Sequence, residues 1–357
     1  MASTTKMTYR FLGDSGLLVS KLALGAWMDA RPEYTADAWF ELMKTAFGHG
    51  INFFDTAECY NWGHSEELMG DAIVKGINEG VWTREDLVVS TKIFAGTKGF
   101  TECGPNGQGV SRKHLVEGIR ISLKKMQLEY VDVIFCHRSE PYTPIEETVR
   151  AMNFIINQGL AFYWGTSEWS SADIAEACAV ADKLGLIRPI VEQPQYNMFE
   201  RSKVEFAFAD LYKKYKLGLT VWSPLASGIL TGKYSRDLPT NSRLANEHLQ
   251  SLFAPKFAEN VAKARELQSV ADKVGCSMAQ LSIAWCVSNE NVSTVLLGAR
   301  NSTQLGETVK ALEFVDKLTP EVKSEIDAIV KFVSELPAED HLYRLRGRHL
   351  AAAEQQN

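Results

Sequence analysis

The sequence has no excess of basic residues, no long apolar run and no closely spaced pair of cysteines. Its 38 lysine and arginine residues are outnumbered by 44 aspartate and glutamate residues, for a net charge of −6. Proteins that bind nucleic-acid phosphates usually carry a basic excess, so we expect no nucleic-acid partner. No stretch approaches the ~20 apolar residues that cross a bilayer, so we expect no direct membrane insertion.

The six cysteines are scattered along the chain, and none belongs to a Cys-x-x-Cys pair. This spacing predicts reduced thiols rather than a disulfide framework or a metal site. The first six residues also lack the apolar core of a signal peptide. We therefore expect a cytoplasmic protein without a bound metal.

Two common nucleotide-binding patterns are missing as well. No Gly-x-Gly-x-x-Gly motif follows a strand, and the Gly-rich segment 104–109 does not join a strand to a helix. Segment 228–234 lacks the spacing and the Ser or Thr of a P-loop. Neither a Rossmann-type dinucleotide site nor an ATP-binding loop is therefore expected.

The sequence does contain a regular alternation of short apolar runs and amphipathic segments. With 45% hydrophobic and 23% charged residues, its composition is typical of a globular protein. Helices are expected at 35–49, 66–77 and 111–126, with helical periodicity between the later strands. After a hairpin-like start at 9–12 and 17–19, strands are expected at 21–24, 51–54, 87–91, 131–135, 161–165, 190–192, 219–221 and 293–296.

Eight strand-then-helix units with short apolar strands predict a parallel sheet buried on both faces. An open doubly wound sheet is one possibility, but closure into a (β/α)8 TIM barrel explains the number of units and the length better. We expect an N-terminal β-hairpin before the barrel and extra helices with a tail after it.

No Pro-, Gly- or Ser-rich linker divides the chain, so residues 1–336 are expected to form one barrel domain. Residues 337–357 are expected to form a C-terminal tail, a frayed helix. Its arginines, Arg344, Arg346 and Arg348, suit either a solvated tail or a partner-binding segment, and the solvated tail is the favoured interpretation.

Four ionisable side chains lie at or just beyond the ends of three consecutive expected strands, where TIM barrels carry their active sites. Asp55 follows the strand at 51–54 and precedes Tyr60 by five positions, Lys92 follows the next strand, and His137 follows the third. Taken singly, each residue also fits an ordinary structural role. The Asp suits a helix cap, the Lys a place at the surface and the Tyr a place in the core. Together they suit acid–base chemistry on a carbonyl group. A neighbouring ammonium is expected to lower the pKa of the tyrosine, and a carboxylate to hold that ammonium in place.

At these positions the sequence resembles a known family. Segments 52–60, 90–92 and 131–137 are similar to the active-site segments of aldo-keto reductases. More narrowly, the sequence resembles the potassium-channel β-subunit branch of that family. This resemblance lies in segments 128–133, 148–152, 162–167, 222–226 and 283–286. The similarity runs from about residue 9 to residue 331.

The resemblance implies a catalytic tetrad of Asp55, Tyr60, Lys92 and His137. Animal channel subunits usually have Asn at the His position, so His137 brings this chain closer to the plant and microbial members. The implied activity is NADPH-dependent reduction of aldehydes and ketones to alcohols, with Tyr60 as the proton donor. The alternative is a redox-sensing β subunit that regulates a voltage-gated potassium channel.

The same resemblance implies how NADPH or NADP+ is bound. Ser167 and Gln193 match the residues that hold the nicotinamide, Lys233 the pyrophosphate lysine, and Arg243 the arginine of the adenosine 2′-phosphate. Two arginines, Arg243 and Arg300, favour NADPH over NADH. The remaining cofactor-binding residues implied are Trp27, Asp55, Trp222, Ser223, Pro224, Leu225, Ala226, Ser227, Gly228, Gly298, Gln304 and Glu307.

Some positions depart from the channel-subunit pattern and leave the tightness and release rate of the cofactor open. Glu33 replaces Gln and Glu168 replaces Arg, while Asn241 and Thr308 replace the Tyr and Asn that end the cofactor clamp.

The substrate is expected to be a small carbonyl compound, bound by Trp27, Tyr60, His137 and Trp62. Trp27 suits a core position equally well. The resemblance further implies a homotetramer and, as a possible partner, the α subunit of a potassium channel.

Overall fold

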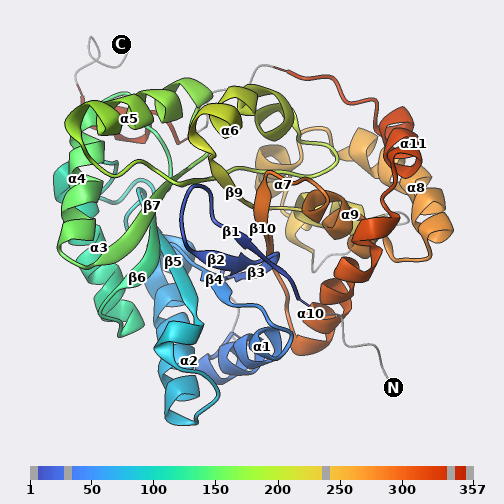
Figure 1. The fold of residues 1–357 in the computed structure, drawn as a ribbon, viewed down its shortest axis with the longest axis horizontal. Coiled ribbons are helices and arrows are strands. Elements are labelled where there is room, and N and C mark those ends of the chain that lie inside the picture. Colours follow the sequence, from blue (N-terminus) through green and yellow to red (C-terminus); the bar gives the residue numbers. More distant parts are fainter. Residues whose placement is uncertain (1–6, 28–33, 235–241, 336–341, 351–357) are drawn as a thin grey trace.

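The computed structural model describes residues 7–27, 34–234, 242–335 and 342–350. Within these residues, eight parallel strands close into a barrel in the order β10-β3-β4-β5-β6-β7-β8-β9 (Figure 1). The strands are β3 (Leu22–Gly25), β4 (Phe53–Asp55), β5 (Val88–Ile93), β6 (Val131–Cys136), β7 (Ala161–Ser167), β8 (Val191–Gln193), β9 (Gly218–Val221) and β10 (Val292–Leu297). The expected TIM barrel is confirmed, and the open-sheet alternative is wrong because β9 pairs with β10 and β10 with β3.

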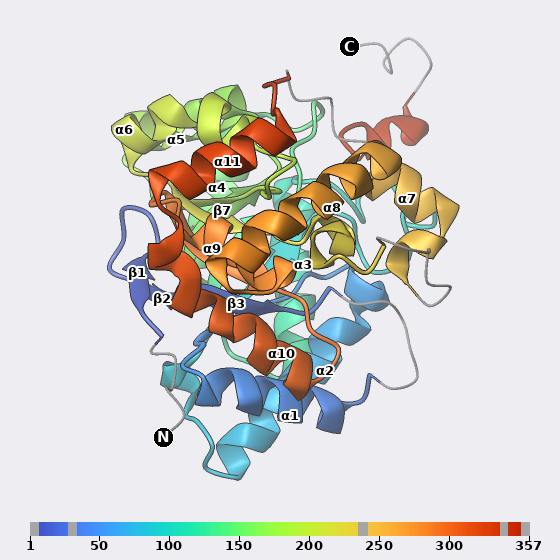
Figure 2. The same cartoon turned by 90° about the vertical axis from the view of Figure 1, so that its right-hand side faces the viewer.

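Helices surround the barrel and cover its outer face (Figures 1 and 2). Side-chain caps start several of them: Thr35 and Ser111, for example, accept hydrogen bonds from backbone N–H groups of the first turn. The helices of the described residues are α1 (Ala36–Gly48), α2 (His64–Asn78), α3 (Arg112–Met126), α4 (Ile145–Asn157), α5 (Ser171–Leu184), α6 (Ala209–Tyr215), α7 (Glu247–Phe253), α8 (Phe257–Val274), α9 (Met278–Val287), α10 (Ser302–Val309) and α11 (Pro320–Val330).

The predicted hairpin is also present, as the antiparallel strands β1 (Tyr9–Phe11) and β2 (Leu18–Ser20). It lies across the centre of the barrel in Figure 1. Leu12 and Val19 are fully buried and belong to the same apolar cluster as Phe53 and Phe135 of the barrel strands. The hairpin therefore closes the end of the barrel at which the strands begin.

The described part of the chain holds no helix that is both long and apolar enough to cross a membrane. Nor do its histidine, cysteine and acidic side chains form a cluster of three or more that could bind a metal ion.

The C-terminal segment differs from the expectation. Residues 342–350 contain a 3₁₀ turn, η7 (Leu345–His349), which packs on the barrel domain. Arg346 Nη1 lies 2.9 Å from Oε1 of Glu140, a residue whose side chain is almost fully buried. Arg348 Nη2 donates to Gln108 Oε1 at 2.6 Å. A solvated tail is therefore wrong for this segment, because Arg346 and Arg348 meet buried acceptors. Residues 336–341 and 351–357 lie outside the described residues.

One position in the hairpin turn should control how well the hairpin closes the barrel. Gly13 has a φ of +59°, and a Cβ there would collide with the carbonyl oxygen of Ile190 and lie 2.9 Å from the N atom of Gly218. Gly13→Ala should therefore lower the free energy of unfolding by at least about 2 kcal/mol, from left-handed strain and overpacking.

Gly16, in the same turn, provides the control, because a Cβ there meets no atom within 4 Å. Gly16→Ala should change the unfolding free energy by less than about 0.5 kcal/mol. Urea unfolding of both variants measures the difference, and equal stabilities would contradict a docked turn.

Candidate active site

A cavity of about 620 Å³ opens where the barrel strands end, at the opposite end from the hairpin. Its volume falls within the range of small-molecule and cofactor sites. Residues that follow or end the strands line it, among them Asp55, His137, Ser167, Gln193 and Trp222. The parallel arrangement thus brings polar side chains from distant parts of the sequence to one edge.

A buried ion pair lies at the bottom of this cavity. Lys92 Nζ is 2.6 Å from Asp55 Oδ2 and also donates to the carbonyl oxygen of Thr56 at 2.7 Å. The Lys92 side chain is 0% exposed. The other carboxylate oxygen, Oδ1, accepts from Ser90 Oγ at 2.7 Å and from Gln193 Nε2 at 3.2 Å. Both charges are therefore fully hydrogen-bonded, as buried charges need to be.

Tyr60 extends this pair toward the cavity. Lys92 Nζ also donates to Tyr60 Oη at 3.1 Å. Tyr60 starts the 3₁₀ turn η1 (Tyr60–Gly63), in which Asn61 and Trp62 have the left-handed φ values of +47° and +57°. Non-glycine residues in this region are strained, and such strain concentrates at functional sites.

Burial dominates the electrostatics of the phenol. Burial raises the pKa of Tyr60 above its ordinary value, and Lys92 lowers it by less than burial raises it. The ammonium therefore acts in the expected direction, but burial outweighs its effect. For Lys92, burial lowers the pKa, but Asp55 and Tyr60 outweigh it, so the pKa is raised. At neutral pH the site holds a protonated phenol beside a charged ammonium.

His137 packs against Tyr60 and completes the group. The two rings meet edge to face with centroids 5.7 Å apart, and the imidazole Nδ1 lies 3.8 Å from Cys59 Sγ. Burial, Arg138 and Lys92 together hold the pKa of His137 well below its ordinary value. The imidazole is therefore neutral at physiological pH. The structure brings together all four residues of the predicted tetrad.

Glu58 organises the loop beside the tetrad. Its Oε1 atom accepts from the backbone N–H groups of Phe94 and Gly96, at 2.7 and 2.8 Å, and lies 3.1 Å from His114 Nε2. The carboxylate is almost fully buried. It ties the turn after β4 to the loop after β5, which supplies Ala95 and Phe100 to the cavity wall.

The expected nicotinamide residues lie together on one wall. Ser167 Oγ donates to the carbonyl oxygen of Gln193 at 2.9 Å, and Gln193 in turn reaches the carboxylate of Asp55. Trp222 follows β9 on the same wall. Gln193 therefore adjoins the tetrad directly, and Ser167 is linked to it through Gln193.

Most of the expected pyrophosphate segment lines the cavity too, namely Ser223, Pro224, Leu225, Ser227, Gly228 and Lys233. Ser223 and Ser227 have left-handed φ values of +56° and +55°. At Gly228, with a φ of +95°, a Cβ would lie 2.5 Å from Lys233 Nζ. Glycine thus lets the ammonium pass close over the backbone. Ala226, by contrast, is buried and does not line the cavity.

Of the residues expected to bind the adenosine, most line the cavity and one does not. Gly298, Arg300, Gln304 and Thr308 line the cavity, and Gln304 Oε1 accepts from the backbone N–H of Arg300 at 2.9 Å. Glu307 does not line it; its carboxylate is 2.6 Å from Lys310 Nζ on the helix surface. Glu33, Asn241 and the side chain of Arg243 lie outside the described residues.

The sequence model of the aldo/keto reductase family matches residues 21–331, which include every barrel strand. The chain belongs to the aldo/keto reductase family. All residues of the proposed tetrad and of the proposed cofactor wall fall within this match.

Curated relatives agree with the narrower resemblance. The chain is 49% identical over 327 residues to proteins of Oryza sativa subsp. japonica and Arabidopsis thaliana, each named a probable voltage-gated potassium channel subunit beta. A putative voltage-gated potassium channel subunit beta of Schizosaccharomyces pombe is 45% identical over 344 residues. These alignments cover 91 to 93% of this chain and 97% of each relative. The resemblance to the channel β-subunit branch is thus confirmed.

The predicted substrate residues Trp27 and Trp62 both line the cavity of this aldo/keto reductase. Trp62 is 56% exposed and meets Phe100 edge to face, with centroids 6.0 Å apart. Sequence reasoning missed Phe100, Arg138 and Leu342, which also line the cavity. Arg138 could have been found, since it directly follows His137, but no local pattern marks Leu342.

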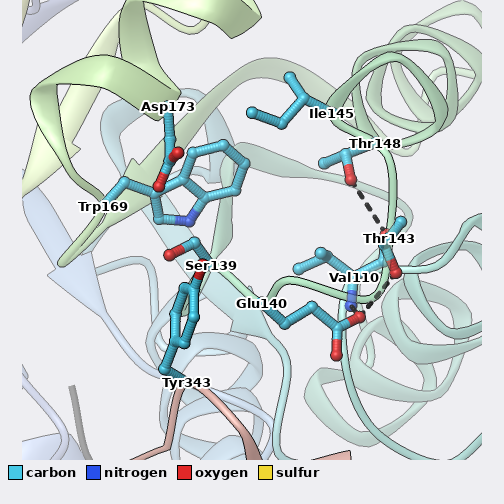
Figure 3. Close-up of a pocket in the computed structure, with 9 residues that line it drawn as sticks. All are labelled: Val110, Ser139, Glu140, Thr143, Ile145, Thr148, Trp169, Asp173 and Tyr343. Atoms are coloured by element: carbon cyan, nitrogen blue, oxygen red, sulfur yellow. Dashed lines mark hydrogen bonds between the residues drawn. The ribbon is translucent and has the colours of Figure 1, made fainter. Parts of the chain in front are cut away.

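A second, much smaller cavity of about 30 Å³ lies under the C-terminal segment. Figure 3 shows Trp169, Ser139, Glu140 and Tyr343 around it. Glu140 Oε2 and Trp169 Nε1 are buried there and have no hydrogen-bond partner among the described residues. The volume suits one or two water molecules, each of which needs about 10–15 Å³.

Proposed function

We propose that this protein is an NADPH-dependent reductase of aldehydes and ketones. The observation that carries the proposal is the chain of contacts from Asp55 through Lys92 to Tyr60, ending in a hydroxyl on the wall of a 620 Å³ cavity. A structural ion pair has no need of a phenol at the cavity surface, whereas carbonyl reduction needs a positioned acid.

The residues have separate tasks in this reaction. Tyr60 Oη holds the proton that the carbonyl oxygen takes up as its carbon is reduced. Lys92 stabilises the phenolate left behind, and Asp55 keeps the ammonium charged and in place. His137 is neutral, so it can orient the carbonyl oxygen by a hydrogen bond without adding a charge.

The cavity fits a nicotinamide dinucleotide. Such a cofactor supplies the hydride when it is bound. Ser167 and Gln193 offer hydrogen-bonding groups beside the tetrad, while Gly228 and Lys233 suit a pyrophosphate that comes close to the backbone. Arg300 lines the cavity where the adenosine end would lie, and we propose that it and Arg243 bind the 2′-phosphate.

A second candidate function follows from the names of the relatives. The names support a β subunit of a voltage-gated potassium channel. We propose that in this role the protein would sense redox state and bind the channel's α subunit as a homotetramer. The two functions are compatible, because the tetrad lies within one chain. The free state of all six cysteines supports a cytoplasmic location.

The first prediction tests the acid. Tyr60→Phe should lower kcat for an aromatic aldehyde by about 10²–10⁴-fold while NADPH binding survives. In the wild type, the rate should be constant between pH 6 and 8. The raised pKa of Tyr60 keeps the phenol protonated there and the lowered pKa of His137 keeps the imidazole neutral, so loss of rate should begin only as the pH approaches the raised pKa of Tyr60.

Absorbance at the NADPH band measures this rate, and cofactor fluorescence measures binding. An unchanged kcat in the Phe variant would show that Tyr60 is not the acid. A wild type that binds NADPH but reduces no member of a broad carbonyl panel would favour the regulatory subunit.

The second prediction tests the choice of cofactor. Arg300→Ala and Arg243→Ala should each weaken NADPH binding by about 1.5–3 kcal/mol, the range for a hydrogen bond to a charged group. NADH, which has no 2′-phosphate, should bind as it does to the wild type. Titration of both nucleotides measures the difference, and equal losses would contradict the phosphate role.

The third prediction concerns assembly. The purified protein should be a homotetramer with carbonyl-reducing activity in the absence of any channel, since cyclic rings need only one repeated contact. Size-exclusion chromatography with light scattering gives the mass directly. A strictly monomeric species would exclude the ring.

A further inference from the structure

Glu168 lies directly after β7 and links three neighbouring segments at the cavity wall. Its Oε1 atom accepts from the backbone N–H of Gln195 at 2.6 Å and from Trp222 Nε1 at 2.9 Å. Its Oε2 atom is 2.6 Å from Lys203 Nζ, which also donates to the carbonyl oxygen of Glu168 at 2.9 Å. The side chain is 12% exposed.

The backbone of Glu168 indicates that these contacts are strong. Its φ is +59°, in the left-handed region, which costs a non-glycine residue about 1–2 kcal/mol. The Lys203 bond to the carbonyl oxygen and the contacts of the carboxylate offset that strain. The conformation turns the side chain toward Trp222 and away from solvent.

The charge state of Glu168 suits this role. Burial raises its pKa, but Lys203, Arg138 and the hydrogen bonds outweigh burial and bring the pKa below its ordinary value. The carboxylate is therefore ionised at neutral pH and acts only as an acceptor. It can then bind the indole, the amide and the ammonium at the same time.

Trp222 is the residue whose side chain this carboxylate orients. Its backbone pairs with the segment after β8, since Trp222 N donates to Pro194 O and Tyr196 N donates to Trp222 O, both at 3.1 Å. Glu168 holds the opposite part of the residue, the indole N–H. The ring lines the cavity on the same wall as Ser167 and Gln193.

We propose that Glu168 is a positioning residue that holds the Trp222 indole in place beside the nicotinamide region and thereby slows the exchange of the cofactor. This inference rests on the NADPH-dependent function proposed above. A wall that is free to move opens a way out for a bound ligand, whereas a wall held at both ends keeps it enclosed.

A purely electrostatic role predicts a different outcome. Glu168 neutralises Lys203, so removing its charge would leave a net positive charge near the cavity and slow the release of an anionic nucleotide. Position and charge can be separated, because one substitution changes the reach of the side chain and another changes its charge.

Two conservative variants make the separation. Glu168→Asp keeps the charge, tolerates the left-handed backbone and withdraws the carboxylate from Trp222 Nε1. Glu168→Gln keeps the reach and an acceptor oxygen but removes the charge. Positioning predicts that the Asp variant releases NADPH about tenfold faster, as for loss of a hydrogen bond, and the Gln variant within about threefold of wild type.

Stopped-flow displacement of NADPH measures the release rate. Acrylamide quenching of tryptophan fluorescence in the cofactor-free protein gives a second readout, and the Asp variant should be quenched more. Trp222→Phe should release NADPH as fast as the Asp variant, and adding Glu168→Asp to it should have no further effect.

Glu205→Ala is the matched control. Glu205 is also a partly buried carboxylate, paired with Arg201 and Tyr196 Oη, but it does not line the cavity. Its loss should lower the melting temperature while NADPH release stays at the wild-type rate.

The outcomes are distinct. Wild-type release and quenching in the Asp variant, slower release in the Gln variant, or additive effects in the double variant would each overturn the positioning role. A wild type that binds no NADPH would overturn the proposed cofactor, and with it the effect on exchange; the quenching experiment then still tests whether Glu168 holds the indole.

Discussion

The buried ion pair between Lys92 and Asp55 is the interaction on which the rest of the site depends. Removing either charge from water costs several kcal/mol, so the pair is stable only when the remaining hydrogen-bonding capacity is used. Here β4, β5 and β8 supply the partners, with Ser90 and Gln193 on the carboxylate and the Thr56 carbonyl on the ammonium. The strands must therefore keep their register for the site to exist. The strand register that stabilises the barrel is therefore the same register that gives the site its geometry.

The same burial explains which groups in the cavity are charged and which are neutral. Desolvation raises the pKa of Tyr60 and lowers that of His137, and both effects favour the neutral form. Lys92 stays charged because Asp55 compensates for its desolvation. The result is one charged pair behind two neutral, hydrogen-bonding rings. The two neutral rings thus present hydrogen-bonding groups to the cavity, while the Lys92–Asp55 pair lies buried behind them.

The barrel and the tetrad could be predicted because their signals are local. Asp55, Lys92 and His137 each lie at or just beyond the end of an apolar strand, and parallel strands bring their ends together. Contacts between loops are not local: Arg346 meets Glu140 across 206 positions, and no periodicity marks either residue. The net direction of the Tyr60 pKa shift could not be predicted for a related reason. Its sign depends on how deeply the ring is buried, which the spacing of charged residues does not reveal.

Strain is concentrated where this aldo/keto reductase is expected to bind its substrate and cofactor. Among the described residues, Asn61, Trp62, Ser223 and Ser227 all have left-handed backbones and all line the cavity, and Glu168 adjoins it. Each conformation opposes folding, so the surrounding contacts must outweigh it. The apolar clusters of the barrel domain supply that stability. The loops at the strand ends are thus free to take conformations suited to binding rather than to folding, and the ionic contacts of Glu168 keep one such loop in place.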